Sequence, residues 1–271
     1  MVDGIALRLL GPVEVLIHDS WTTPRKPQQR LVLAMLALRA GQVVPVDELI
    51  DAIWEEHPPR SARGSLQVLM TRLRQTLARM PGGQLERCGD GYRLQMDTGR
   101  VDVHQFRSLA RAGRAAPAGR AAVAAFDQAL ALWQGPALAD VRSTARVEAI
   151  RTALADERLW AVQDRIAGLL DCGQEREAAA QLPGLLARHP LAERLAGMLM
   201  VALYRCGQRG DALSVFRDIR GRLSGELGVE PGPELQGLHR QILEGAADLA
   251  APRGGAGPAL SGPSPGRPRR P

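Results

Sequence analysis

The most distinctive chemistry in this sequence is a run of arginines with no acids among them. No aspartate or glutamate occurs between Glu56 and Glu86, whereas five arginines do, and we expect all five on one helix over about residues 61–79. They are Arg60, Arg63, Arg72, Arg74 and Arg79. Guanidinium groups neutralise DNA phosphates and form bidentate hydrogen bonds to guanine. The placement of these arginines therefore predicts a contact with nucleic acid.

The predicted helix has two faces of different character. Its apolar residues recur at helical spacing and cover about a third of the circumference, the width of a buried face. They are Leu66, Leu69, Met70, Leu73 and Leu77. The opposite face carries side chains that can read base edges in a major groove, and we expect base contacts from Gln67, Val68, Thr71, Arg72 and Gln75. The alternative is an ordinary solvated helix face.

The elements around this helix would position it. Short strands, two helices and the Pro58-Pro59 break precede it, Ser61 is expected to cap it, and a hairpin follows it. The expected elements are strands at 7–10 and 13–17, a short strand near 21–23, a helix that begins at Pro27, a strand at 43–44, a helix at 47–55 and a hairpin at 85–94. A base-reading helix followed by a hairpin predicts a winged helix-turn-helix.

Other charged residues flank the expected groove-binding face. Phosphate or wing contacts are predicted for Lys26, Arg30, Arg63, Arg74, Arg79, Arg87 and Arg93. Two readings stay open for Glu55 and Glu56, in the turn before the arginine helix. In winged helices of this type such a turn can face RNA polymerase; the alternative is two solvated carboxylates that end a helix.

Beyond residue 100 the pattern is helical. Seven helices are expected over about 102–113, 118–133, 143–171, 174–188, 191–205, 209–227 and 232–244. The motif Cys-Gly-Gln recurs at 172–174 and 206–208, a spacing of 34 residues, which is the tetratricopeptide period. We therefore expect a mainly α protein with a small β component. The winged domain would occupy 1–99, a tetratricopeptide-like bundle 100–250, and a disordered Pro/Gly/Arg tail 251–271.

Composition narrows the function further. The net charge is +6, but only the clustering on one helix points to DNA. The three cysteines and five histidines show no metal-ligand spacing, and no phosphate-binding GxxxxGK[ST] loop occurs. We expect no catalytic residues, no metal, no cofactor and no membrane span, and hence a cytoplasmic, nucleoid-associated protein. Trp133, Trp160, Tyr204 and Phe216 lie at helical spacings that favour core positions.

Several sequence blocks, in order over about residues 5–245, resemble the Streptomyces antibiotic regulatory protein (SARP) family. The blocks are LLGPVEV at 9–15, LQVLMTRLR at 66–74, GY at 91–92, VHQF at 103–106, ALWQGPAL at 131–138, HPLAER at 189–194 and ELGVEPGPEL at 226–235. The resemblance implies an OmpR-type winged helix joined to a bacterial transcriptional activation domain. It further implies a homodimer on tandem direct repeats of double-stranded DNA, recruitment of RNA polymerase through contacts that include its sigma factor, and control of an antibiotic biosynthetic gene cluster.

Two positions depart from the family pattern. Cys88 stands where many relatives have arginine, so Arg87 or Arg93 would supply the minor-groove contact. The sequence at 27–30 is PQQR where relatives often have PKQR, so a phosphate contact would move to Lys26 or be lost. Three alternatives stay open for the whole chain: a protein-interaction adaptor, a sensor that binds a small molecule in the bundle, and a fragment of a larger regulator cut before an ATPase module.

Overall fold

The computed structural model describes residues 4–80, 82–246 and 249. The predicted tail at 251–271 lies outside the described residues. The described residues form two compact units, unit 1 up to Ile166 and unit 2 from Ala167 onward. Within the described part of the chain, no helix combines the length and the apolar character that crossing a membrane requires.

Unit 1 begins with a three-stranded antiparallel sheet in the order β1-β2-β3. The strands are β1 (Leu7–Arg8), β2 (Glu14–Ile17) and β3 (Ser20–Thr22). Ile17 pairs with Ser20, so the hairpin loop contains only His18 and Asp19. Both have positive φ, at 46° and 61°, as a two-residue turn of the type that matches strand twist requires. The predicted N-terminal strands are thus confirmed.

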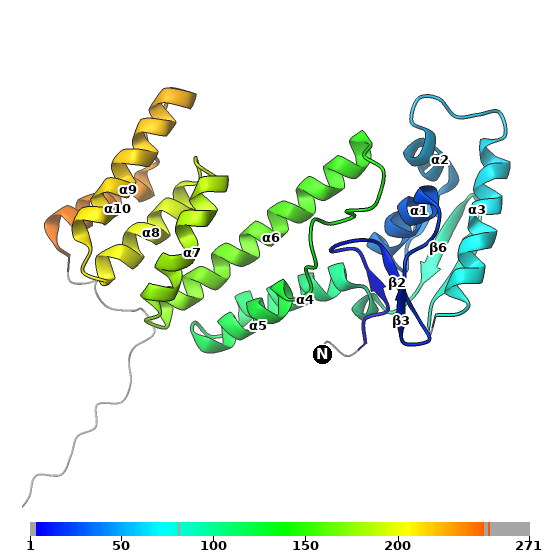
Figure 1. Ribbon diagram of the computed structural model, residues 1–271, viewed down its shortest axis with the longest axis horizontal. Coiled ribbons are helices and arrows are strands. Elements are labelled where there is room, and N and C mark those ends of the chain that lie inside the picture. Colours follow the sequence, from blue (N-terminus) through cyan, green and yellow to red (C-terminus); the bar gives the residue numbers. More distant parts are fainter. Residues whose placement is uncertain (1–3, 81, 247–248, 250–271) are drawn as a thin grey trace, which may run out of the picture. The chain divides into compact units, whose positions relative to one another are not determined.

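A helix trio and a second sheet follow (Figure 1). The elements are α1 (Pro27–Leu38), β4 (Val43–Pro45), α2 (Val46–Trp54), α3 (Ala62–Leu77), β5 (Gln84–Cys88) and β6 (Gly91–Gln95), with strand order β4-β6-β5. Pro27 occupies the first turn of α1, where its missing N–H costs nothing. A Cβ on Gly91 would lie 2.8 Å from the carbonyl oxygen of Val44, so only glycine lets β4 and β6 approach this closely. This is the winged helix predicted from the sequence.

Two details of the arginine helix differ from the prediction. Arg60 precedes α3 and Arg79 follows it, so three of the five arginines lie within the helix. Ser61 occupies the position before the first turn, but its side chain makes no capping hydrogen bond. The backbone N–H of Ser65 instead closes the first turn on the Ser61 carbonyl, at 2.9 Å.

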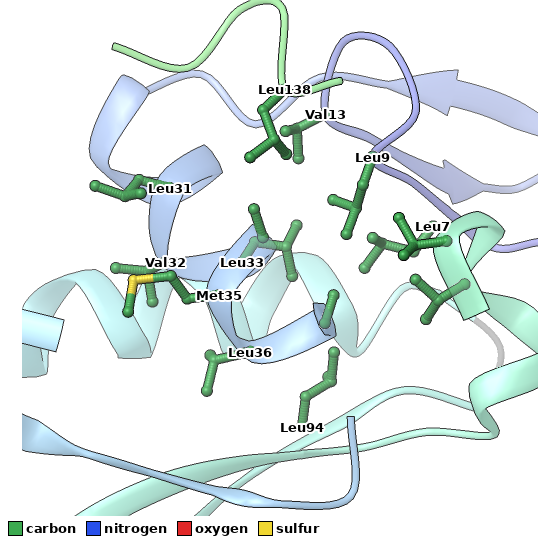
Figure 2. Close-up of a cluster of buried hydrophobic side chains, with 14 of the residues drawn as sticks. Leu7, Leu9, Val13, Leu31, Val32, Leu33, Met35, Leu36, Leu94 and Leu138 are labelled. Atoms are coloured by element: carbon green, nitrogen blue, oxygen red, sulfur yellow. The ribbon is translucent and has the colours of Figure 1, made fainter. Parts of the chain in front are cut away.

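Three further helices share the core of the winged segment. They are α4 (Asp102–Ala115), α5 (Arg120–Leu130) and α6 (Ala145–Asp171), with the short η1 (Thr98–Arg100) before them. One cluster of buried side chains runs from Ile5 to Ala161. Figure 2 shows Leu138, from the connection before α6, beside Val13 and close to Leu33 of α1. The two packing units therefore divide inside α6. The predicted boundary between a winged domain at 1–99 and a helical domain at 100–250 stays a prediction.

A buried carboxylate ties the segment that follows β1 to the first of these helices. Asp102 is 2% exposed. Its oxygens accept hydrogen bonds from the backbone N–H of Leu9 (2.9 and 2.8 Å), Leu10 (2.9 Å) and Val103 (2.7 Å). Burial raises the pKa of Asp102 from 3.8 to about 6, because desolvation outweighs these N–H donors. Asp102 thus satisfies three buried donors where two segments meet.

Unit 2 repeats one helix-turn-helix geometry. Its elements are α7 (Glu175–Arg188), α8 (Glu193–Arg205), α9 (Arg209–Arg222), η2 (Leu223–Leu227) and α10 (Pro233–Glu244). Gly173 and Gly207 have φ of +72° and +80°. The next residues, Gln174 and Gln208, each donate a backbone hydrogen bond of 2.9 Å five residues back, to Leu169 and Leu203. The equivalent Ala178 and Ala212 are both fully buried. The 34-residue repeat predicted from the sequence is therefore also a repeat of backbone geometry.

Candidate nucleic-acid interface

The two faces of α3 are those expected from the sequence. Leu66, Leu69, Met70, Leu73 and Leu77 are buried. The opposite side chains are exposed, and they are Gln67, Val68, Thr71, Arg72 and Gln75. Val68 is 55% exposed, so its side chain can reach a contact outside the protein. The helix thus holds a polar surface in a fixed position because its other side is anchored in the core.

Arg72 is the free cation of this surface. Its side chain is exposed and makes no hydrogen bond or ion pair with any residue that the structure describes. Thr71, beside it, donates its hydroxyl to the Gln67 carbonyl at 3.0 Å, which fixes the rotamer and leaves the oxygen able to accept. A guanidinium free of internal partners can present its paired N–H groups to a guanine edge.

Arg74 has a different environment. Its Nε donates to the Leu85 carbonyl at 3.0 Å, and its guanidinium carbon lies 5.8 Å from the centre of the Tyr92 ring. Both partners belong to the β5–β6 hairpin. Arg74 therefore fixes the hairpin against α3, and only its terminal nitrogens are available for a phosphate.

The two arginines of the hairpin are not equivalent. Arg93 pairs with Glu86 at 2.7 Å, and this partner raises the pKa of Arg93. Arg87 is exposed and has no side-chain partner among the described residues. Of the two wing candidates proposed from the sequence, Arg87 is the one with a guanidinium free to contact DNA.

The remaining predicted phosphate contacts divide in the same way. Arg63 is exposed but pairs with Asp47 (2.8 Å) and Asp90 (3.4 Å), which ties α3 to α2 and to the hairpin turn. Lys26, before α1, and Arg79, after α3, are exposed.

The two polymerase candidates also lie at the surface. Glu55 and Glu56 are exposed in the turn between α2 and α3, where Glu55 has φ of +54°.

The structure gives Arg30 a structural role in place of the predicted phosphate contact. Its side chain is 15% exposed and pairs with Asp140 at 3.0 Å. It also donates to the carbonyls of Pro24 and Asp140, both at 3.0 Å. The carboxylate of Asp140 in turn accepts from the backbone N–H of Val13 at 2.8 Å. Arg30 therefore belongs to the junction between the winged segment and the chain before α6, 110 residues away in the sequence.

Trp160 also differs from the prediction. The sequence favours a core position for it, but its side chain is 56% exposed. Phe216, from the same set, is buried as expected, at 6% exposure. Helical spacing identifies which residues share a face, but not whether another helix covers that face. Neither the exposure of Trp160 nor the anchoring role of Asp102 could be recognised from the local sequence pattern.

No group of three or more histidine, cysteine, aspartate or glutamate side chains is placed to hold a metal ion within the described residues. The three cysteines are free thiols. What the structure offers is a rigid polar helix face, a hairpin beside it and cations without a partner in the part of the chain that the structure describes. This arrangement suits binding to a polyanion whose grooves admit a helix.

Comparisons with known proteins agree with this arrangement. The family model "Transcriptional regulatory protein, C terminal" matches residues 22–94, and the model "Bacterial transcriptional activator domain" matches residues 101–243. The regulatory protein DnrI of Streptomyces peucetius is 37% identical over 262 residues, which cover 92% of this chain and 95% of DnrI. The chain belongs to the SARP family of transcriptional activators. Both family models describe transcriptional regulators, and DnrI is a regulatory protein.

Two further relatives show how this SARP chain compares with longer proteins. The regulatory protein AfsR of Streptomyces griseus is 37% identical over 253 residues, but the chain spans only 26% of AfsR. The structure of Mycobacterium tuberculosis EmbR with a low-affinity phosphopeptide superposes with a TM-score of 0.85 at 34% identity. That match covers 89% of this chain and 65% of the EmbR chain. The winged segment and helical bundle therefore form the shared part of these regulators.

Proposed function

We propose that this activator reads direct repeats in double-stranded DNA through the exposed face of α3. Base contacts are assigned to Gln67, Val68, Thr71, Arg72 and Gln75. The observation that carries the proposal is the exposed guanidinium of Arg72, which has no partner among the described residues. Every other arginine within α3 is engaged by a neighbouring element.

Phosphate contacts would flank this base-reading face. Lys26, Arg79 and Arg87 are exposed and are assigned to the DNA backbone, with Arg87 on strand β5 of the hairpin. Arg63, Arg74 and Arg93 contribute less, because each already has a carboxylate or carbonyl partner. Each phosphate that the protein neutralises releases counterions. Each such contact therefore makes the slope of log K against log salt concentration steeper by about one.

A single winged domain makes few base contacts, so two copies on tandem sites about one helical turn apart would gain affinity through avidity. We assign this role to a homodimer formed on DNA. The exposed Glu55 and Glu56 are assigned to RNA polymerase, including its sigma factor. The similarity to SARP regulators supports an antibiotic biosynthetic gene cluster as the target, with the protein acting at the nucleoid in the cytoplasm.

Genomic selection of bound fragments, followed by gel-shift titration of the full chain, tests the DNA assignment. Arg72→Ala should weaken binding to the selected repeat by about 5- to 150-fold, equivalent to about 1–3 kcal/mol, and relax preference at one base pair. Arg142→Ala is the matched control, because it removes one exposed arginine outside α3 and the hairpin. Unchanged affinity and unchanged base preference in Arg72→Ala would refute the assignment.

The polymerase assignment needs a separate readout. In transcription with purified polymerase, Glu55→Ala/Glu56→Ala should abolish activation while leaving the gel-shift titration unchanged. Activation at the wild-type level would show that this turn is only solvated.

The paired arrangement on DNA is tested by the number of repeats. A single repeat should bind more weakly than the tandem pair, and equal affinity would contradict the paired arrangement.

A further inference from the structure

A cleft in unit 1 lies where α4 faces α6. Its volume is about 720 Å³, within the range of small-molecule sites. The residues that matter to its chemistry are Arg107, Ser108, Arg111, Arg114, Glu157 and Trp160. The cleft is separate from the polar face of α3, and neither the winged segment's DNA contacts nor the repeat of unit 2 uses it.

The charge of the cleft is concentrated at one point. Arg107, Arg111 and Arg114 stand at helical spacing along α4. Arg107 makes a two-point ion pair with Glu157, at 2.8 and 2.7 Å, and Arg114 pairs with Asp164 at 3.4 Å. Carboxylates of α6 therefore hold the outer two arginines.

Arg111, between them, is left without an acid. Its Nε donates to the Arg107 carbonyl at 3.3 Å. Its terminal nitrogens have no partner among the described residues. A guanidinium held by its Nε and open at its other edge is oriented to bind an anion through two parallel hydrogen bonds.

Trp160 gives the cleft an aromatic wall. It lies on α6 three residues after Glu157, and it is 56% exposed. An exposed indole has a flat face that can stack on another ring, and such stacking contributes more than area burial alone. An open arginine edge and an open indole face in one cleft are complementary to a ligand that has both a ring and a negative charge.

We propose that the α4–α6 cleft binds a small planar aromatic anion, whose ring stacks on Trp160 and whose carboxylate or phosphate group binds Arg111. The outer arginines stay with their carboxylates and fix the spacing of the two helices. The hydroxyl of Ser108, exposed in the same cleft, can donate to the anion. Since α3 belongs to the same packing unit, such a ligand stabilises the unit that reads DNA.

Isothermal titration calorimetry of the full chain tests this site with four probes. The probes are 2-naphthoate and AMP, each with a neutral counterpart, 2-naphthylmethanol and adenosine. At least one anion should bind saturably below about 1 mM and at least tenfold more tightly than its neutral counterpart. A response to naphthoate alone identifies a carboxylate ligand, and a response to AMP alone identifies a phosphate ligand.

Variants separate this site from adventitious binding. Arg111→Gln and Trp160→Ala should each lower the affinity for the anion at least tenfold. Arg142→Ala should not, because Arg142 is also exposed but lies outside the cleft. Both altered side chains are exposed, and circular dichroism of each variant verifies its fold. Absence of saturable binding by both anions, or equal affinity in all three variants, overturns the proposal.

Discussion

Replacing Asp102 with alanine should destabilise unit 1, which contains α3, although Asp102 lies outside residues 22–94, the segment matched by the model for the C-terminal part of transcriptional regulatory proteins. The change strands three buried N–H donors, on Leu9, Leu10 and Val103. At about 1–3 kcal/mol for each unsatisfied donor, the loss is about 3–9 kcal/mol. Removing a buried charge whose pKa is raised to about 6 from 3.8 returns about 3 kcal/mol at neutral pH. The middle of the range leaves a net loss of about 3 kcal/mol.

Tryptophan fluorescence during urea unfolding measures this loss selectively, because all four tryptophans of the chain lie in unit 1. Asp97→Ala is the matched control. Asp97 accepts one hydrogen bond, from the exposed Gly99 N–H at 2.9 Å, so its loss should cost about 1 kcal/mol or less. A variant Asp102→Ala that is as stable as wild type, or more stable, would refute the role of this carboxylate as an anchor.

Three other predictions use the same protein. Because native Asp102 has a pKa near 6 and the unfolded chain one near 3.8, its contribution to unfolding free energy falls as pH rises from about 4 to 6. The unfolding free energy of wild type minus that of Asp102→Ala should therefore be about 2 kcal/mol larger at pH 4 than at pH 7 in urea titrations, and the opposite trend would contradict the raised pKa. Arg30→Ala should cost about 1–3 kcal/mol by breaking the Asp140 pair, yet leave the salt dependence of DNA binding unchanged; a slope lowered by about one would restore the phosphate assignment. Gly91→Ala should cost about 1–3 kcal/mol of stability in the same urea assay, because its Cβ would press on the Val44 carbonyl; wild-type stability would show that β4 can shift.

Local patterns in the sequence predict the elements of this fold well. The apolar stripe of α3 and the recurring Cys-Gly-Gln both depend on residues close together in the chain. Helical spacing alone places Leu66 and Leu73 inside and Arg72 outside, and the structure agrees. The turn glycines predict the two bends with positive φ because glycine reaches that conformation without strain.

Local sequence patterns do not predict contacts between segments that are far apart in the chain. Asp102 lies 93 residues from Leu9, and Arg30 lies 110 residues from Asp140. An arginine beside an expected DNA-binding helix favours a phosphate contact unless its acid partner is known. The exposure of Trp160 likewise depends on how α6 is oriented against α4, which periodicity does not specify.

The shared core of residues before and after position 100 has a consequence for engineering. A chimaera that takes only the winged segment from another regulator would place foreign residues against the native Asp102 and Asp140. The backbone N–H groups and the guanidinium group of the foreign segment would then have to lie where their counterparts lie in this protein. A graft of the whole first unit, through Ile166, keeps every such pair from one parent. Under the proposed assignment of base contacts to α3, the part of this chain that must be transferred together with them is the whole first unit and not the helix alone.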